Sequence, residues 1–140
     1  MSFLRPKGVL AVQMPANFTA PSHTAMAEAA QEGPWRTVLA PLLKPNPVAT
    51  PAWYYGVLES HAASVDIWET VYLQVLTGED PVKEWTKGTW LGPLLAALEP
   101  HHRDAFEANY AARVRAAYPA RADGRTLFPF RRLFIVARRA

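Results

Sequence analysis

Residues 7–15 read KGVLAVQMP, a turn followed at once by an unbroken apolar run. A strand with one exposed face alternates polar and apolar residues, whereas Val9–Val12 contains no polar residue, as is typical of a strand covered on both faces. The run therefore predicts a strand near residues 8–14 that lies inside a sheet. The segment before it, Ser2–Gly8, is interpreted as the last turn of a helix that Pro6 breaks and Gly8 closes.

Two further strands are predicted downstream. Residues 65–76, VDIWETVYLQVL, alternate between apolar and polar positions, which indicates a half-exposed strand at the edge of a sheet. Residues 127–138 contain a second unbroken apolar run, Leu133–Ala137, which indicates a second interior strand. The sequence thus predicts two interior strands and one edge strand.

Four helices are predicted between the strands, each from a capping residue or a proline at its start. In chain order they begin at Ser22 as N-cap, at Thr50–Pro51, at Asp80–Pro81 and at Pro100, and the first ends near Gly33–Pro34. Gly88 and Pro93 are expected to break the third helix. Helices and loops thus fill the sequence between the strands.

The composition indicates one soluble, folded domain. The chain of 140 residues is 50% hydrophobic and 19% charged, and it has no apolar stretch of the roughly 18 residues that a membrane span needs. No secretory leader is recognised, so a cytoplasmic location is expected and no membrane partner. The absence of cysteine excludes disulfides and thiol chemistry. The net charge of +3 is too small to indicate nucleic-acid binding.

Three segments in combination carry a resemblance to a known family. They are KGVLAVQMPANF followed by APSH, then VDIWETVYLQVLTGEDPVKEWTKGT, and finally ADGRTLFPFRRLFIVARR. A strand that ends in Gln-Met-Pro, a Trp-Glu-Thr segment, a Trp-x-x-Gly-Thr element and the Arg-Arg terminus are specific when they occur together. Over essentially its whole length, the chain resembles the C-terminal half of the trans-aconitate methyltransferases.

The resemblance implies an α/β fold, the C-terminal part of the Rossmann-like sheet of class I methyltransferases with a helical substrate cap. In that family the strand order is 3-2-1-4-5-7-6 and the last strand is antiparallel. The strands near 8–14, 65–76 and 127–138 would be strands five, six and seven of a single partial domain over residues 1–140. Strand five would then also pair with a strand four that this chain does not contain.

The resemblance also implies S-adenosylmethionine as the cofactor of the complete enzyme. The family binds it at a glycine-rich turn after strand one and at an acidic residue after strand two. This sequence has seven glycines, which are scattered and form no such cluster. The cofactor-binding half is therefore expected to be absent, and a chain that supplies it is an expected partner.

The implied reaction transfers a methyl group to a carboxylate of trans-aconitate or a related small acid. A carboxylate with a pKa of about 4 is already ionised at neutral pH, so no catalytic base is predicted. Alignment by polar and aromatic side chains would supply the catalysis. The substrate-binding candidates are Asn17, His23, Tyr54, Tyr55, Trp85, Lys87, Thr89, Arg131 and Arg132.

These candidates have structural alternatives. Asn17 is also a common turn residue, the tyrosines suit packing, and Lys87 would serve equally as a solvated lysine. His101–His102 with Asp104 is not interpreted as a metal site, because adjacent histidines on a helix point in different directions.

One element departs from the family pattern. Members commonly read Gly-Thr-x-Leu-Arg-Pro where residues 88–93 read GTWLGP, so Gly92 stands in place of an arginine suited to a carboxylate. The acid that is methylated is therefore left open. Two function classes remain: the substrate-side half of an acid methyltransferase, inactive alone, or a non-catalytic remnant that binds a partner.

Overall fold

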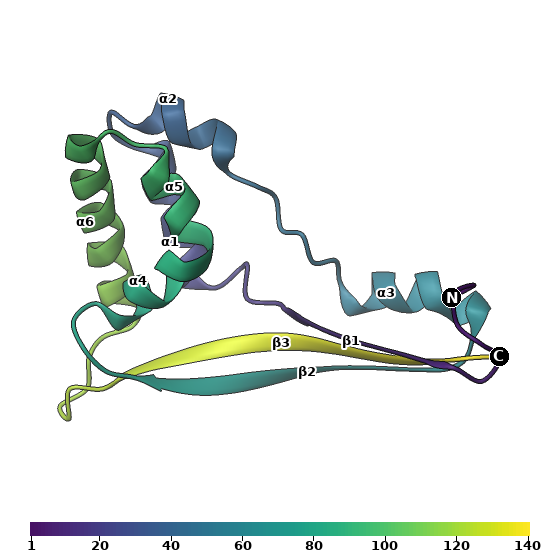
Figure 1. Cartoon of the computed structure of the whole chain (residues 1–140). Coiled ribbons are helices and arrows are strands. Elements are labelled where there is room, and N and C mark those ends of the chain that lie inside the picture. Colours follow the sequence, from purple (N-terminus) through teal and green to yellow (C-terminus); the bar gives the residue numbers. More distant parts are fainter. The chain divides into compact units, whose positions relative to one another are not determined.

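The computed structural model describes all of residues 1–140, which form an α/β fold (Figure 1). Its strands are β1 (Val9–Pro15), β2 (Ala62–Leu76) and β3 (Thr126–Arg139). Its α-helices are α1 (Pro21–Gln31), α2 (Arg36–Leu39), α3 (Pro51–Leu58), α4 (Pro81–Thr86), α5 (Gly92–Ala96) and α6 (Pro100–Ala117). Short 3₁₀ turns span Ala40–Leu42 and Glu59–His61, and a π-helical turn spans Lys87–Leu91.

The strands form one sheet in the order β1-β3-β2. β1 runs antiparallel to β3, with Val12 opposite Ile135. This order places the strand near 127–138 in the centre and the strand near 65–76 at an edge, as predicted. The identification of the three as strands five, seven and six of a larger sheet stays a prediction.

The chain divides into two compact units, which are described separately below. The first unit contains Met1–Asn17, Asn46–Tyr72 and Pro129–Ala140. The second contains Phe18–Pro45 and Leu73–Phe128. The long strands β2 and β3 contribute residues to both units. That residues 1–140 act as one partial domain stays a prediction.

In the first unit, β3 is the best-covered strand. Leu133, Ile135 and Ala137 are buried, whereas Phe134 between them is half-buried and stacks on Trp68 of β2, with ring centroids 5.2 Å apart. The central position predicted for this strand is correct. Only the face that carries Leu133, Ile135 and Ala137 is fully buried. The prediction that β3 is buried on both faces is therefore correct for this face and wrong for the face that carries Phe134.

β1 lies at the edge of the sheet, and its prediction as a strand buried on both faces is wrong for this chain. Val9 is 55% exposed and Val12 is 37% exposed. An apolar run makes a strand suited to cover on both faces, but the cover itself depends on neighbouring elements, and within the chain β1 pairs with β3 alone. The preceding residues form turns instead of a helix end, with the Gly8 N–H donating to the Arg5 carbonyl.

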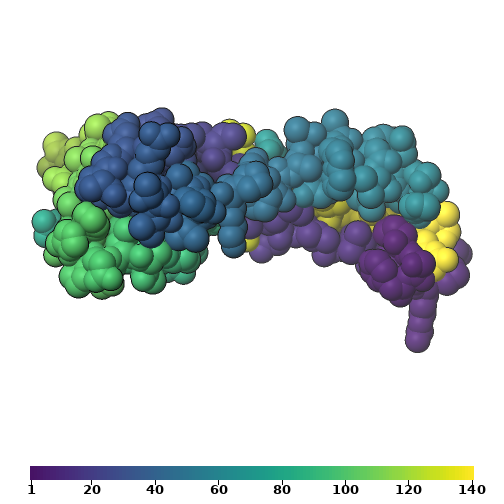
Figure 2. All heavy atoms as spheres, turned by 90° about the horizontal axis from the view of Figure 1, so that it is seen from above, coloured from purple at the N-terminus to yellow at the C-terminus, as the bar shows by residue number.

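Helix α3 lies beside the sheet in the first unit (Figure 1), and in the view from above its teal residues cover part of the surface of this unit (Figure 2). It starts as predicted, because Pro51 occupies the first turn and the Thr50 hydroxyl accepts a hydrogen bond from the Trp53 N–H at 3.3 Å. The helix contains no charged residue and none of its side chains is buried. It therefore presents an apolar surface.

The second unit is a small helical bundle in which α1 packs against α6 and α4 also contacts both. α6 buries Phe106, Tyr110 and Val114 at the predicted helical spacing. Ala29 and Ala30 of α1 are fully buried, and their small side chains allow the helices to approach closely. This bundle holds the elements that carry His23 and Lys87.

Two predicted helix boundaries in this unit are wrong. Ser22 is not the N-cap of α1: Ala20 takes that place and Pro21 begins the helix, because proline needs no N–H partner in the first turn. Gly88 and Pro93 do not break the third helix, which instead widens into the π-helical turn and continues as α5. Pro93 falls in the first turn of α5, where its missing N–H costs little.

The exposed edge of β1 leads to a first prediction. An apolar, uncharged edge strand favours pairing with another chain, so the 140-residue chain is expected to self-associate through Val9–Gln13. Val12→Lys places a charge on this edge and is expected to weaken the association by at least several-fold, as measured by analytical ultracentrifugation. Val57→Lys, on the exposed surface of α3, is the matched control. A monodisperse monomer at tens of micromolar with slow amide exchange at Val9–Gln13 would contradict the prediction.

Candidate functional site

The candidate substrate-binding residues divide between the two units. The first unit holds Asn17, Tyr54, Tyr55, Arg131 and Arg132. The second holds His23, Trp85, Lys87 and Thr89. The structure therefore describes two sets of candidates, each within its own unit.

In the first unit, Tyr54 and Arg132 are bound to other parts of the sheet unit. The Tyr54 hydroxyl accepts from the Ala49 N–H at 3.3 Å and donates to the Met14 sulfur at 3.5 Å, which fixes α3 to the end of β1. The Arg132 Nε donates to the Gln13 side-chain oxygen across the β1–β3 pair. These contacts favour structural roles for both side chains.

The structure shows no side-chain hydrogen bond or ion pair for the other three candidates of the first unit, which are Asn17, Tyr55 and Arg131. Asn17 lies two residues after the end of β1 and is only 5% exposed. Tyr55 is 50% exposed on α3, and Arg131 is exposed on β3. Of this set, Asn17 is the one residue that is buried.

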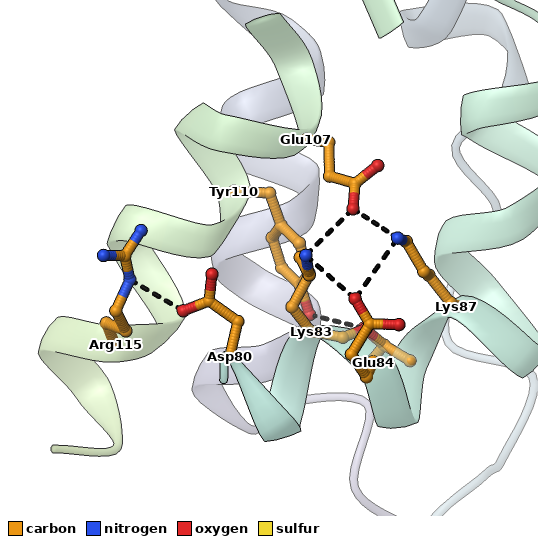
Figure 3. Close-up of polar contacts among 8 residues, drawn as sticks. Asp80, Lys83, Glu84, Lys87, Glu107, Tyr110 and Arg115 are labelled. Carbon is orange, nitrogen blue, oxygen red and sulfur yellow. Dashed lines mark hydrogen bonds and ion pairs between the residues drawn. The ribbon is translucent and has the colours of Figure 1, made fainter. Parts of the chain in front are cut away.

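In the second unit, Lys87 belongs to a cluster of two lysines and two glutamates that joins α4 to α6 (Figure 3). Lys83 lies 2.9 Å from Glu84 and 3.0 Å from Glu107, and Lys87 contacts the same two carboxylates. The hydrogen bond that Lys87 donates to the Glu107 carboxylate raises the pKa of Lys87, so its ammonium group stays charged. The Lys87 ammonium group is thus already paired with two carboxylates, so a bound acid would have to share it with Glu84 and Glu107.

Trp85 and Thr89 make local contacts. The Trp85 ring meets Phe128 edge-on at 6.0 Å while remaining 41% exposed. The Thr89 hydroxyl donates to the Thr86 carbonyl at 3.3 Å, one turn earlier. These positions favour packing and helix stabilisation.

His23 lies in the first turn of α1, among aromatic rings. Its ring centroid is 5.0 Å from that of Phe18 and 5.8 Å from that of Trp90, both in edge-on arrangement. Its Nδ1 is 3.3 Å from the Ser22 hydroxyl, whereas its Nε2 is buried and has no hydrogen-bond partner. Burial lowers the pKa of His23, so the ring is neutral at pH 7.

Tyr110 is a polar residue of the bundle core that the sequence analysis did not single out as a site residue. Its side chain is fully buried, and its hydroxyl donates to the Ser22 carbonyl at 2.9 Å and lies 3.1 Å from the Thr86 hydroxyl. The available signal was a tyrosine at a core position, since a buried phenol needs a partner. Burial raises the pKa of Tyr110 to about 12 even though its contact with Thr86 lowers it.

A cavity of about 150 Å³ opens elsewhere in the second unit. Its wall includes Asp80, which has a left-handed backbone (φ 47°), and Arg115, whose Nε is 2.8 Å from the Asp80 carboxylate. Asp80 occupies the cap position of α4 as predicted, but its side chain pairs with Arg115 and not with the helix. None of the predicted site residues lines this cavity.

The residues of this chain do not fit the loop by which class I methyltransferases hold S-adenosylmethionine. The connection between β1 and α1, residues 16–20, contains no glycine. The glycines occur singly in turns and helices. Gly78 and Gly124, for example, lie in turns and have a positive φ. The structure also has no group of three or more side chains suited to a metal ion, and no helix has the length and apolarity to cross a membrane.

The three-stranded α/β fold, with its last strand antiparallel to the first, is compatible with the C-terminal part of a methyltransferase. No family model matches the chain. Among curated proteins, it is 48% identical to the trans-aconitate 2-methyltransferase of Azoarcus sp. (strain BH72) over 134 residues, which cover 96% of this chain and 52% of that protein.

Two other relatives with the same name give similar values. The protein of Streptomyces coelicolor is 49% identical over 97% of this chain and 46% of its own length, and that of Agrobacterium fabrum is 46% identical over 98% and 54%. The chain thus spans about half the length of the curated relatives it matches. The predicted resemblance to trans-aconitate 2-methyltransferases is confirmed, and the coverage is consistent with their C-terminal half.

The raised pKa of Tyr110 leads to a second prediction. Because the folded chain holds this proton more tightly than the unfolded chain, its contribution to stability is complete below about pH 10 and is lost as the pH rises toward about 12. Across this window the free energy of unfolding should fall by up to about 1.4 kcal/mol per pH unit from this group. When the free energy of unfolding is measured by urea denaturation at each pH, the Tyr110→Phe variant should not show this part of the decline.

Tyr72→Phe is the control, because Tyr72 is 43% exposed and should leave the decline unchanged. At neutral pH, Tyr110→Phe should itself lower the free energy of unfolding by about 1 kcal/mol, since it removes the buried hydrogen bond from the phenol to the Ser22 carbonyl. Equal pH slopes for the original chain and Tyr110→Phe would show that the phenol is not held in this way.

Proposed function

We propose that this chain is the substrate-side half of an S-adenosylmethionine-dependent methyltransferase of the trans-aconitate 2-methyltransferase type. It would act in esterifying a carboxylate of trans-aconitate or of a related small acid. The observation that carries the proposal is the identity of 44–49% to proteins of that name along 96–98% of the chain. The strand order β1-β3-β2 and the antiparallel β3 support it.

Within this proposal, the chain's own task is to bind and orient the acid. A carboxylate is ionised at neutral pH and needs no base, so rate enhancement comes from alignment and from hydrogen bonds to the acid. In the first unit, the candidates for which the structure shows no side-chain partner are the Asn17 amide and the Arg131 guanidinium; in the second unit, the His23 Nε2 is buried and unpaired. Lys87 adds a cation that Glu84 and Glu107 partly neutralise.

The cofactor would be held by residues that correspond to the unmatched half of the relatives. Those residues could belong to the same longer protein or to a second chain. The exposed edge of β1 supports this proposal, because an apolar strand edge is suited to pairing with a further strand. Strand numbering five, seven and six follows from the same proposal.

A second candidate is a non-catalytic module that binds a partner through the same edge. The observation that favours it is the lack of any glycine-rich loop fitted to the cofactor. The two candidates differ in what the chain does once the missing half is supplied, and the reconstitution experiment below separates them.

The missing loop leads to a third prediction: the 140-residue chain alone does not bind S-adenosylmethionine. Isothermal titration calorimetry of the purified chain should give no heat of binding at micromolar concentrations. The Azoarcus relative at full length serves as the positive control. A one-to-one micromolar complex with the isolated chain would overturn the prediction.

The fourth prediction concerns reconstitution. The half of the Azoarcus protein that this chain does not match, expressed separately and mixed with this chain, should restore transfer of labelled methyl from S-adenosylmethionine to carboxylic acids. Asn17→Ala should lower this transfer at least tenfold, because it removes the amide proposed to bind the acid, whereas Asn46→Ala, in an exposed loop, should not. A folded complex that methylates none of a panel of acids, trans-aconitate included, would rule out the methyltransferase proposal and favour the partner-binding module.

A further inference from the structure

Two lysines and two glutamates of the second unit form a closed ring of ion pairs between the segment that begins with α4 and helix α6 (Figure 3). Lys83 and Lys87 are four residues apart, so they lie on one side of their helical segment, and Glu107 faces them from α6. We refer to Lys83, Glu84, Lys87 and Glu107 as the ion-pair ring. Each ammonium group contacts both carboxylates, so the four charges sum to zero.

In this ring, one carboxylate oxygen is bound by two cations. Oε1 of Glu84 lies 2.9 Å from the Lys83 Nζ and 3.2 Å from the Lys87 Nζ. In the other ion pairs of the chain each carboxylate contacts a single cation: Glu28 and Glu32 with Arg113, and Asp80 with Arg115. The space between the two ammonium groups therefore accommodates a carboxylate, and Glu84 shows how one fits there.

The core of the unit holds Lys83 and Glu107 in place. The Thr86 hydroxyl donates to the Lys83 carbonyl at 2.8 Å and lies 3.1 Å from the Tyr110 hydroxyl, which fixes the turn that carries Lys83 against α6. Glu107 lies one turn before Tyr110 on α6. The side chains of Lys83 and Glu107 are only 15% and 20% exposed, so neither can leave the ring easily.

The backbone at Lys87 is fixed by the π-helical turn Lys87–Leu91, which Gly92 permits. A Cβ atom at position 92 would lie 2.6 Å from the Lys87 carbonyl oxygen, well inside the contact distance of carbon and oxygen. The obstacle is backbone, so rotation of a side chain cannot relieve it. π-helical turns of this kind often occur at functional sites, and this one begins at a lysine of the ring.

Glu84 is the member of the ring that can leave. Its side chain is 52% exposed, the largest exposed fraction of the four, and its carboxylate is held by the two lysines. An ion pair at such an exposed position contributes little to stability, so the carboxylate can turn into solvent at small cost. The ring then keeps two ammonium groups and the Glu107 carboxylate, and its net charge becomes +1.

The charged groups that shift the pKa values of the ring are its own members. Burial opposes the shifts at Lys83 and Glu107, yet hydrogen bonds and charges within the ring raise the pKa of Lys83 and lower that of Glu107. Hydrogen bonds within the ring likewise raise the pKa of Lys87 and lower that of Glu84. All four groups are therefore charged at neutral pH, and an incoming carboxylate meets two cations.

We infer that the ion-pair ring is a carboxylate-binding site in which Glu84 occupies the place of a carboxylate of the acid substrate. When the acid binds, a carboxylate that does not react contacts the Nζ atoms of Lys83 and Lys87, and Glu84 turns into solvent. Because another carboxylate accepts the methyl group, the acid carries at least two, as trans-aconitate does. The inference rests on the proposed function, to which it adds the residues that bind the acid and the side chain that competes with it.

The fifth prediction concerns binding of trans-aconitate to the 140-residue chain, followed by NMR titration. Glu84→Gln removes the competing charge and keeps the size of the side chain, so it should tighten binding at least threefold, because the acid no longer has to displace a carboxylate. Lys83→Met and Lys87→Met should each weaken binding at least fivefold, since each removes a charged donor. The ε-methylene signals of both lysines should shift in a saturable way.

Glu32→Gln is the matched control. It makes the same change in net charge and releases Arg113 from one of its two carboxylates, but it provides no pair of ammonium groups, so binding should stay within about twofold. The uncharged trimethyl ester of trans-aconitate should not shift the lysine signals. Glu84 is exposed, so this test does not depend on whether the lysine variants fold.

Three results would each overturn the inference. The first is unchanged or weaker binding in Glu84→Gln. The second is an equal tightening in Glu32→Gln, which would trace the effect to net charge alone. The third is a titration in which the signals of Lys83 and Lys87 do not shift.

Methyl transfer in the reconstituted complex separates this inference from the proposed function. Glu84→Gln should lower the KM for trans-aconitate at least threefold and leave kcat within about twofold, because a carboxylate that does not react is bound equally before and during the transfer. Transfer with an unchanged KM in this variant would overturn the inference and leave the methyltransferase function standing. Transfer to no acid, together with tighter binding of trans-aconitate to the Glu84→Gln chain, would remove the methyltransferase function and leave the carboxylate site.

Discussion

The helical unit depends on a single buried hydroxyl group. Tyr110 of α6 donates to the Ser22 carbonyl at the start of α1 and meets the Thr86 hydroxyl at the end of α4, so one side chain fixes three helices. A buried phenol is tolerated only if it is hydrogen-bonded, and these partners exist only when the helices are correctly placed. The positions of His23, next to Ser22, and of Lys87, next to Thr86, follow from this arrangement.

Features of the fold that depend on local chemistry could be predicted from the sequence. Thr50–Pro51 starts a helix because its cap and its first-turn proline act within a few residues. The burial of residues 106, 110 and 114, each four positions after the last, follows from the helical period. In contrast, the burial of β1 could not be predicted from this chain alone, because cover depends on neighbours that no local pattern supplies. The continuation through Gly88 could not be foreseen either, since a π-helical turn requires the close approach of Gly92 to the Lys87 carbonyl.

The candidate site shows the same division between local and long-range information. Residue types just beyond a strand end drew attention to Asn17 and His23, whose roles in binding stay predictions; of the two, His23 has a buried ring nitrogen without a hydrogen-bond partner. The sequence did not reveal that Glu107 pairs with Lys87, because this contact joins two helices that only the tertiary fold brings together. Likewise, the contact of Trp90 with His23 depends on a turn geometry that the sequence signals only through one glycine. Motifs thus identify candidates, and the packing of the helices decides which of them remain available to a ligand.

The central proposal is that β1 is adapted to pair with a strand like those in the half of the curated relatives that this chain does not match. Amide hydrogen exchange, read by mass spectrometry, measures this pairing directly. On addition of the unmatched half of the Azoarcus protein, protection at Val9–Gln13 should rise by at least tenfold, while protection in the α1–α6 bundle should stay nearly constant. Unchanged exchange at Val9–Gln13 in a mixture that nevertheless forms a complex would contradict the claim.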